Sequence, residues 1–402
     1  MKYDFETIFD RHGKDALAID GLGTVENFTP DKPEKNFTSI PLWVADMNFA
    51  TAPSIIEKII ERANHPLFGY FQLSEEYFTS IINWQKIRNN VTDLKPEHIG
   101  WENGVLGGVI SALNILCSKG DNVLIHSPTY VGFEMSLENN GYKIIHSPLI
   151  RDEKNIWRMD FEDMEKKICE NKIHAAIICS PHNPCGRVWK KFELEKAFEI
   201  FERHNVFVIS DEIWSDIIFS NHKHFPTAQT NSYAKEHTIS FYSPSKTFNL
   251  AGIVGAYHII YNSWLRDRME KESSLSHYNE QNVFSMHSLI GGYSEIGMDW
   301  LDELNKVLEK NSVYAYEHIK KNYSGVKVSK PEGTYMLFID CEDFCKENKI
   351  SHAELLKKFW AKGITLHDGN LFKSPQSFRL SLASPFSLIE EAFQRIDKYI
   401  FN

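Results

Sequence analysis

Apolar residues along this chain follow one pattern between about residues 100 and 260 and another in the last quarter of the chain. Between about residue 100 and residue 260, apolar helical stretches alternate with short, nearly continuous apolar runs that lack polar alternation. Continuous apolar runs are typical of strands that are buried on both faces of a sheet. The pattern therefore predicts an α/β domain. Its four clearest strand candidates are residues 123–125, 175–179, 206–209 and 238–242.

The pattern after about residue 295 is different. A long helical stretch is followed by a β-like run at residues 333–340, another helix, a loop, a second run at residues 378–382 and a final helix, which is an α+β arrangement. The length of 402 residues also exceeds the size at which a single core keeps growing. We therefore predict an N-terminal arm that is part of a small domain, a large domain and a small C-terminal domain. Their predicted ranges are residues 1–48, 49–290 and 291–402.

Charge and composition limit the possible partners. The net charge of −10 is spread along the chain, which disfavours binding to nucleic acid or to an anionic membrane surface. The first 20 residues are charged, and no apolar run reaches the length of about 18 residues that a membrane span needs, so we expect a cytoplasmic protein. The six cysteines are scattered, which predicts reduced thiols. Cys341 and Cys345 lack a second ligand pair at a familiar spacing, and we expect no metal site.

Polar residues follow each predicted strand of the α/β segment. Because ligands of open α/β sheets bind outside the carboxyl ends of the strands, the chemistry is expected there. These polar ends contain Tyr130, Asn183, Asp211 and Lys246. In addition, residues 103–108 open an apolar helical segment, whose first amides are suited to face an anion.

Lys246 is the residue with the clearest chemical signal. It lies between hydroxyl residues in the run 243–252, just after an apolar strand, where its amine would be partly desolvated and suited to form a Schiff base. Taken alone, the same decapeptide fits a solvated loop equally well. Its place after Asn183-Pro184 and Asp211-Glu212 favours the functional interpretation.

In this order the motifs resemble the fold-type I pyridoxal-5′-phosphate (PLP) enzymes, the aspartate aminotransferase superfamily, over nearly the full chain. The resemblance implies a PLP cofactor, a large domain with a mostly parallel seven-stranded sheet between helices, and a smaller α+β C-terminal domain. More narrowly, the chain is similar to the MalY/PatB group of cystathionine β-lyases. The segments that carry this narrower likeness are residues 41–47, 68–70, 211–216 and 331–335.

The resemblance assigns roles around the cofactor ring. Lys246 would hold PLP as a Schiff base and then remove the substrate's α-proton, and Asp211 would pair with the ring nitrogen. Asn183 would bind the phenolic oxygen and contribute to substrate binding, and Tyr130 would stack on the ring. Each has a structural alternative, which is a helix N-cap for Asp211, a turn for Asn183 and a core ring for Tyr130.

The phosphate would be bound by backbone amides and hydroxyls. Tyr70 would reach it from a neighbouring subunit, because this superfamily builds each site at a homodimer interface. The predicted phosphate-binding residues within the same subunit are Gly104, Val105, Leu106, Ser243 and Ser245.

Two positions depart from the pattern of many relatives. Trp214 replaces a tyrosine, and because an indole donates but cannot accept or ionise, its contact with the ring oxygen is left open. Val254 replaces a phosphate-binding arginine, so the phosphate depends more on the serines, on Tyr70 and on the helix amides.

Arg379 matches the arginine that clamps the substrate's α-carboxylate through a planar two-pronged contact. The alternation of residues 378–382 places it on the strand face opposite Phe378 and Leu380, where either a cavity or solvent would receive it. Ala45 is also predicted to contact the substrate.

These residues serve two competing reactions. The subgroup resemblance favours α,β-elimination on L-cystathionine, cysteine or cysteine S-conjugates, which gives a thiol, pyruvate and ammonia. The alternative is an aminotransferase of aromatic or apolar amino acids, suggested by the 13% aromatic content and by Trp43, Phe68 and Trp214. A PLP-binding regulator with vestigial catalysis is a third possibility, which is weakened because no added DNA-binding segment is visible.

Overall fold

The computed structural model describes residues 1–26, 28–274 and 280–401. Its largest sheet has seven strands in the order β2-β10-β9-β8-β7-β3-β4. Among the described strands of this sheet, β10 alone runs antiparallel to its neighbours, which confirms the predicted mostly parallel sheet. In chain order the strands are β2 (Ile99–Glu102), β3 (Asn122–Ser127), β4 (Lys143–Pro148), β7 (Ala175–Cys179), β8 (Phe207–Asp211), β9 (Thr238–Tyr242) and β10 (Ala256–Ile259).

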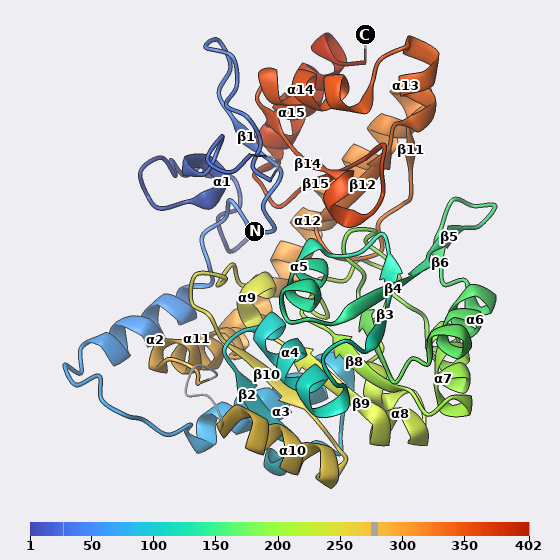
Figure 1. Cartoon of the computed structure of the whole chain (residues 1–402). Helices are drawn as coiled ribbons and strands as arrows, with labels where there is room; N and C mark the ends of the chain where they lie inside the picture. The colour runs from blue at the N-terminus through green and yellow to red at the C-terminus, as the bar shows by residue number, and fades with distance from the viewer. Residues whose placement is uncertain (27, 275–279, 402) are drawn as a thin grey trace.

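Both faces of this sheet are covered by helices (Figure 1). Alternate residues of β7 enter different cores: Ala176 and Ile178 pack with α6 (Phe161–Asn171) and α7 (Lys191–Arg203), whereas Ala175 and Ile177 pack with α4 (Val105–Leu116) and α5 (Val131–Asn139). A strand with apolar neighbours on both faces gains from an apolar residue at every position. The continuous apolar runs in the sequence have this cause.

A second sheet lies in the C-terminal part. It has four strands in the order β11-β12-β15-β14, and all its pairings are antiparallel. The N-terminal arm packs on this part, because β1 (Ile40–Pro41) pairs with β13 (Ile364–Thr365) in a separate two-stranded sheet and Leu42 enters the C-terminal core. Its strands are β11 (Lys327–Val328), β12 (Met336–Asp340), β14 (His367–Asp368) and β15 (Ser377–Ser381), and its helices are α13 (Glu342–Asn348), α14 (His352–Ala361) and α15 (Phe386–Tyr399).

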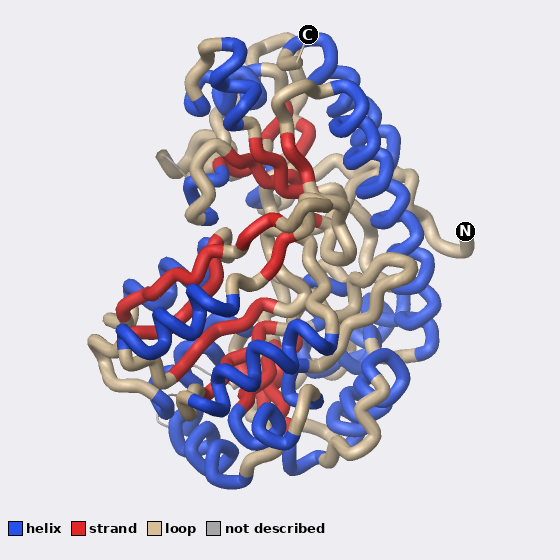
Figure 2. The backbone as a smooth tube through the Cα atoms, turned by 90° about the vertical axis from the view of Figure 1, so that its right-hand side faces the viewer, coloured by secondary structure: helices blue, strands red, loops and turns tan. Residues whose placement is uncertain are grey.

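One long helix, α12 (Glu295–Asn322), links the two parts. Its first half places Trp300 and Leu304 in a core shared with α2 (Pro53–Ala63), α3 (Glu75–Asn89) and α11 (Val283–Gly292), and its second half places Ile319 in the C-terminal core. Figure 2 shows the strands in an upper and a lower group, with helices around both. The predicted boundary at residue 290 falls inside α11. We propose to place it in the turn between α11 and α12.

No helix of the described residues is long and apolar enough to cross a membrane. Nor do three His, Cys, Asp or Glu side chains of those residues gather closely enough to hold a metal ion. The remaining described elements are the 12-residue helix α10 (Ser263–Ser274) and the shorter α1 (Leu17–Asp20), α8 (Ser232–His237), α9 (Pro244–Thr247), β5 (Ile150–Arg151), β6 (Trp157–Arg158) and three 3₁₀ turns at Pro96–His98, Thr227–Gln229 and Gly369–Phe372.

Candidate active site

A cavity of about 290 Å³ opens where β3, β7, β8 and β9 end. These four strands are neighbours in the large sheet, so the segments that follow them converge at one edge. The structure therefore brings together most of the residues predicted for the site, although their roles stay predictions. Those that line the cavity are Ala45, Gly104, Val105, Leu106, Tyr130, Asn183, Asp211, Trp214, Ser243, Ser245 and Lys246.

Lys246 lies on the short helix α9, just after β9. Its Nζ donates a hydrogen bond of 2.9 Å to the Ala45 carbonyl oxygen. Burial, with a smaller contribution from the positive charge of Arg379, lowers the pKa of Lys246 to about 8. A lysine with this pKa is partly neutral near pH 7, which is the form that attacks a carbonyl carbon.

Asp211 is the last residue of β8 and is 4% exposed. Its Oδ1 accepts a hydrogen bond of 3.0 Å from the Ile213 amide. Burial raises the pKa of this carboxyl to about 6, although the Ile213 amide and Lys246 act in the opposite direction. A cationic group inside the cavity would stabilise the charged form of Asp211.

The N-terminus of α4 forms another wall of the cavity. Gly104 is the N-cap residue and has a φ of 89°, which favours glycine. A Cβ at this position would lie 3.2 Å from Cγ1 of Val254, so the backbone approaches that side chain closely. The first turn of α4 thus opens on the cavity, where helix amides can face an anion, and Val254 lines the cavity beside it.

Ser243 also has a structural role, because it is the N-cap residue of α9. Its hydroxyl accepts a hydrogen bond of 3.1 Å from the Ser245 amide and donates one of 2.7 Å to the Gly255 carbonyl oxygen. The hydroxyl proton of Ser243 is therefore already used within the protein. The Ser243 hydroxyl would have to rotate away from the Gly255 carbonyl oxygen to donate to a phosphate, and the sequence did not reveal this competition.

Arg379 lies on β15 and is 2% exposed, so it does not point into solvent. It faces an adjoining cavity of about 530 Å³ that shares Ala45, Tyr130 and Lys246 with the first one. Burial lowers the pKa of Arg379 to about 10, and Nη1 donates to Oδ1 of Asn183 at 3.3 Å. Among the described residues, its hydrogen-bond acceptors are all neutral, so a negative charge entering this cavity would meet a cation that no acidic side chain binds.

Sequence reasoning missed the role of Tyr335. Its ring makes an edge contact with Trp214 at 4.6 Å between centroids, and its hydroxyl donates a hydrogen bond of 3.0 Å to the Ala45 oxygen that also receives Lys246. The Trp214 ring in turn faces the amine of Lys246, whose Nζ lies over the ring at 5.8 Å from its centroid. The motif at residues 331–335 signalled a family likeness without indicating this contact.

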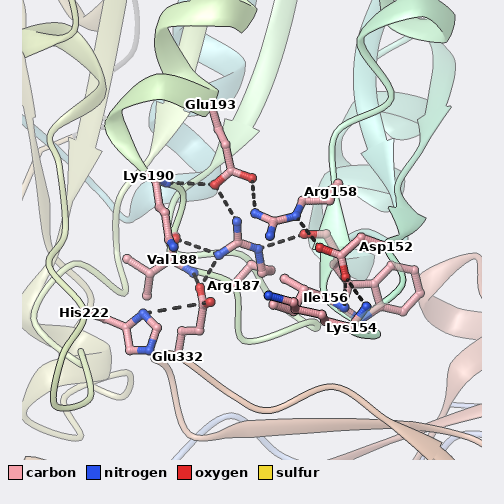
Figure 3. A network of polar contacts seen from close by, with 11 residues as sticks. Asp152, Lys154, Ile156, Arg158, Arg187, Val188, Lys190, Glu193, His222 and Glu332 are labelled. Atoms are coloured by element: carbon pink, nitrogen blue, oxygen red, sulfur yellow. Dashed lines mark hydrogen bonds and ion pairs between the residues drawn. The ribbon is translucent and has the colours of Figure 1, made fainter.

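Figure 3 shows how Glu332, three residues before Tyr335, is held by Arg187 and Val188 of the loop after β7. Arg187, in the loop after β7, is 2% exposed and forms ion pairs with Glu193 and Glu332. Glu332 also accepts a hydrogen bond of 3.1 Å from the Val188 amide. Because burying one unpaired partner of such a network is costly, the loop of Asn183 and the segment that carries Tyr335 are held in register.

Tyr70 is the predicted catalytic residue that the structure does not place in the cavity. It is fully exposed in the loop between α2 and α3, beside Leu67 and Phe68, which are 68% and 57% exposed. The prediction that it serves a neighbouring subunit remains untested. Sequence reasoning assigned no site role to six further cavity residues. Asn103, Asp46 and Ala251 lie inside the motif segments 103–108, 41–47 and 243–252, whereas Cys179, Arg11 and His367 lie outside them.

Fold and site together define a fold-type I enzyme. Residues 39–396 match the family Aminotransferase class I and II, and the chain belongs to this family. It is 31% identical to the cystathionine beta-lyase PatB of Bacillus subtilis over 361 residues, which cover 89% of this chain and 92% of that protein. These findings confirm the family predicted from the sequence.

Solved structures agree with this assignment. The PLP-bound C-S lyase of Staphylococcus hominis has a TM-score of 0.89 and 29% identity, and the match covers 100% of this chain and 99% of that one. A PLP-bound putative aminotransferase of Clostridium difficile has a TM-score of 0.90 and 33% identity, with 100% of both chains covered. The likeness thus extends over both sheets.

Proposed function

We propose that this chain is a PLP-dependent carbon-sulfur β-lyase that converts L-cystathionine, cysteine or cysteine S-conjugates to a thiol, pyruvate and ammonia. One observation carries the proposal: Lys246 and Arg379 line adjoining cavities. The amine of Lys246 has a lowered pKa, and the buried cation of Arg379 has only neutral hydrogen-bond acceptors among the described residues. The likeness to PatB and to the C-S lyase of Staphylococcus hominis supports lyase chemistry.

The cavity residues fit PLP. The amine of Lys246 is suited to its aldehyde, and Asp211, whose pKa burial raises to about 6, is suited to a cationic ring nitrogen. The first turn of α4 is suited to its phosphate. When bound, PLP supplies an electron-accepting ring that stabilises negative charge at the substrate's α-carbon. The residues that would hold it are Tyr130, Asn183, Asp211, Trp214, Lys246, Gly104, Val105, Leu106, Ser243 and Ser245.

The side chains of this chain then divide the remaining work. Arg379 binds the α-carboxylate and fixes the direction of the α-carbon's hydrogen. Lys246, in its neutral form, accepts that proton at Nζ. The Ala45 carbonyl oxygen, which is 2.9 Å from Nζ, retains the amine beside the cavity after proton transfer. A thiolate at the β-carbon can leave from this arrangement, whereas a substrate with a carbon substituent there has no equally good leaving group.

Pyruvate production tests this proposal. Purified holoenzyme incubated with L-cystathionine and no added keto acid is expected to release pyruvate continuously, because β-elimination needs no amino-group acceptor. Pyruvate is measured by coupled reduction, and Lys246→Ala protein is the matched control. Turnover that appears only when a keto acid is added would contradict the lyase assignment.

An aminotransferase of aromatic or apolar amino acids is the second candidate. It is favoured by Trp43 and Phe28, which line the cavity at Arg379, and by the likeness to the putative aminotransferase of Clostridium difficile. The keto-acid arm of the same assay detects it. A protein that binds PLP but turns over neither substrate would instead support a regulator.

We also propose a cytoplasmic homodimer in which Tyr70 reaches the phosphate of the neighbouring subunit. The exposure of Leu67, Phe68 and Tyr70 in one loop supports a surface that a second copy covers. A dimer assembled from one Tyr70→Phe subunit and one Lys246→Ala subunit would then contain a single site with both native side chains. Such a dimer, isolated with two tags, is expected to show about half of the wild-type activity.

The two parent homodimers are the controls for this experiment, and both are expected to be strongly impaired. A mixed dimer that is no more active than its parents would argue that Tyr70 does not act across the interface.

A further inference from the structure

His367 lies directly opposite Arg379, because β14 and β15 pair at these two residues. Nη2 of Arg379 is 3.0 Å from Nδ1 of His367, and His367 is 5% exposed. A guanidinium only donates hydrogen bonds, so Nδ1 must carry the lone pair and Nε2 the proton. The contact thus fixes both the charge and the tautomer of His367, which is neutral.

The surroundings of His367 keep it in this state. Its ring makes edge contacts with Trp43, Phe28 and Phe372 at centroid distances of 5.3, 5.9 and 5.7 Å. Burial and the charge of Arg379 hold the pKa of His367 well below its usual range. Aromatic rings therefore fix the orientation of the imidazole, and the imidazole in turn presents a fixed acceptor to Arg379.

The hydrogen bonds of Arg379 show what this acceptor does. Nη2 donates to the Trp43 carbonyl oxygen at 2.6 Å and to His367, so both of its hydrogens are engaged. Nη1 instead lies beside Asn183, with which it makes only the longer contact of 3.3 Å. Rotation of the guanidinium plane would break the bond to His367. His367 thus selects the rotation in which Nη2 is held, while Nη1 and Nε, which has no hydrogen-bond partner among the described residues, are left to meet a ligand.

We propose that His367 is a positioning residue that orients Arg379 for the α-carboxylate of the substrate. It acts through Arg379 and need not touch the reacting atoms. This inference rests on the proposed function, since it requires an amino-acid ligand. It does not depend on whether the bound amino acid is cleaved or transaminated.

A pair of substitutions separates the acceptor from the ring. His367→Phe retains a ring of similar size among the aromatic neighbours and removes the acceptor. His367→Asn provides an amide oxygen close to the position of Nδ1 and restores an acceptor. Loss of one hydrogen bond to a charged group is expected to weaken amino-acid binding by about 10- to 100-fold in the phenylalanine variant, and the asparagine variant should recover part of that loss.

The readout is binding to holoenzyme, followed through the change in cofactor absorbance. An S-substituted cysteine is compared with the matching S-substituted cysteamine, which lacks the carboxylate. A positioning role predicts that His367→Phe raises the Kd of the amino acid while the Kd of the amine stays unchanged. A parallel rise for both ligands, an unchanged Kd for the amino acid, or an asparagine variant no better than the phenylalanine variant would overturn the proposal.

This outcome is independent of the lyase assay. Wild-type protein that releases no pyruvate would refute the proposed function, yet its absorbance titration would still report on His367. Thermal unfolding of both variants, measured in parallel, shows whether each remains folded at the temperature of the titration.

Discussion

Lys246→Ala protein is expected to lose the visible absorbance band of a lysine-bound cofactor and to lose activity by about 10⁴-fold or more. The amine is the single group that both attaches the cofactor and removes the α-proton in the proposed reaction. Proton transfer by a positioned base alone contributes about 10²- to 10⁴-fold, and loss of the covalent attachment adds to it. Lys246 is placed in the cavity, and burial there lowers its pKa to about 8, so that its amine favours both roles.

The control for this substitution is Lys357→Ala, which removes an exposed lysine from α14. It is expected to leave the spectrum and the rate unchanged. A small primary amine added to Lys246→Ala protein should restore a fraction of the rate, because it replaces the missing base without repositioning the rest of the site. An unaltered absorbance band in the alanine variant would refute the assignment of Lys246.

Position at strand ends is what made much of the site predictable. The runs at residues 175–179 and 238–242 coincide with β7 and β9, because a strand packed on both faces is apolar throughout. Parallel strands end at one edge, so Asn183, Asp211 and Lys246 converge although long segments separate them. Strands β2, β4 and β10 were not predicted, because they are shorter or mixed in burial.

The sequence did not reveal the site contacts that are made by backbone groups or by residues far apart in the chain. The carbonyl oxygens of Ala45 and Trp43 bind Lys246 and Arg379, yet every residue has a carbonyl, and its use leaves no residue type as a signal. His367 faces Arg379 only because β14 pairs with β15. The alternation around Arg379 indicated its strand face but not whether that face met a cavity or solvent, and only the packing of the N-terminal arm over it decides this.

The second large expected effect is the loss of activity when the buried cation of Arg379 is removed. Arg379→Met, which retains the length of the side chain and removes its charge, is expected to lower kcat/KM for L-cystathionine by about 10²- to 10⁴-fold, since the positive charge and its charge-assisted hydrogen bonding to the α-carboxylate are lost. Arg379→Lys should fall between this variant and wild type, because an ammonium retains the charge but cannot reproduce the planar contact. Steady-state rates provide the measurement, taken on variant holoenzymes whose cofactor absorbance equals that of wild type.

Arg203→Lys is the matched control, because Arg203 lies on α7 with a side chain that is 52% exposed and pairs with Glu165 at the surface. Exposed pairs of this kind contribute little, so its rates should equal those of wild type. The rate of Arg379→Met with an S-substituted cysteamine should also equal that of wild type, however slow, because that substrate has no carboxylate to lose. If Arg379→Met affected both substrates equally, Arg379 would be supporting the cavity rather than binding the carboxylate.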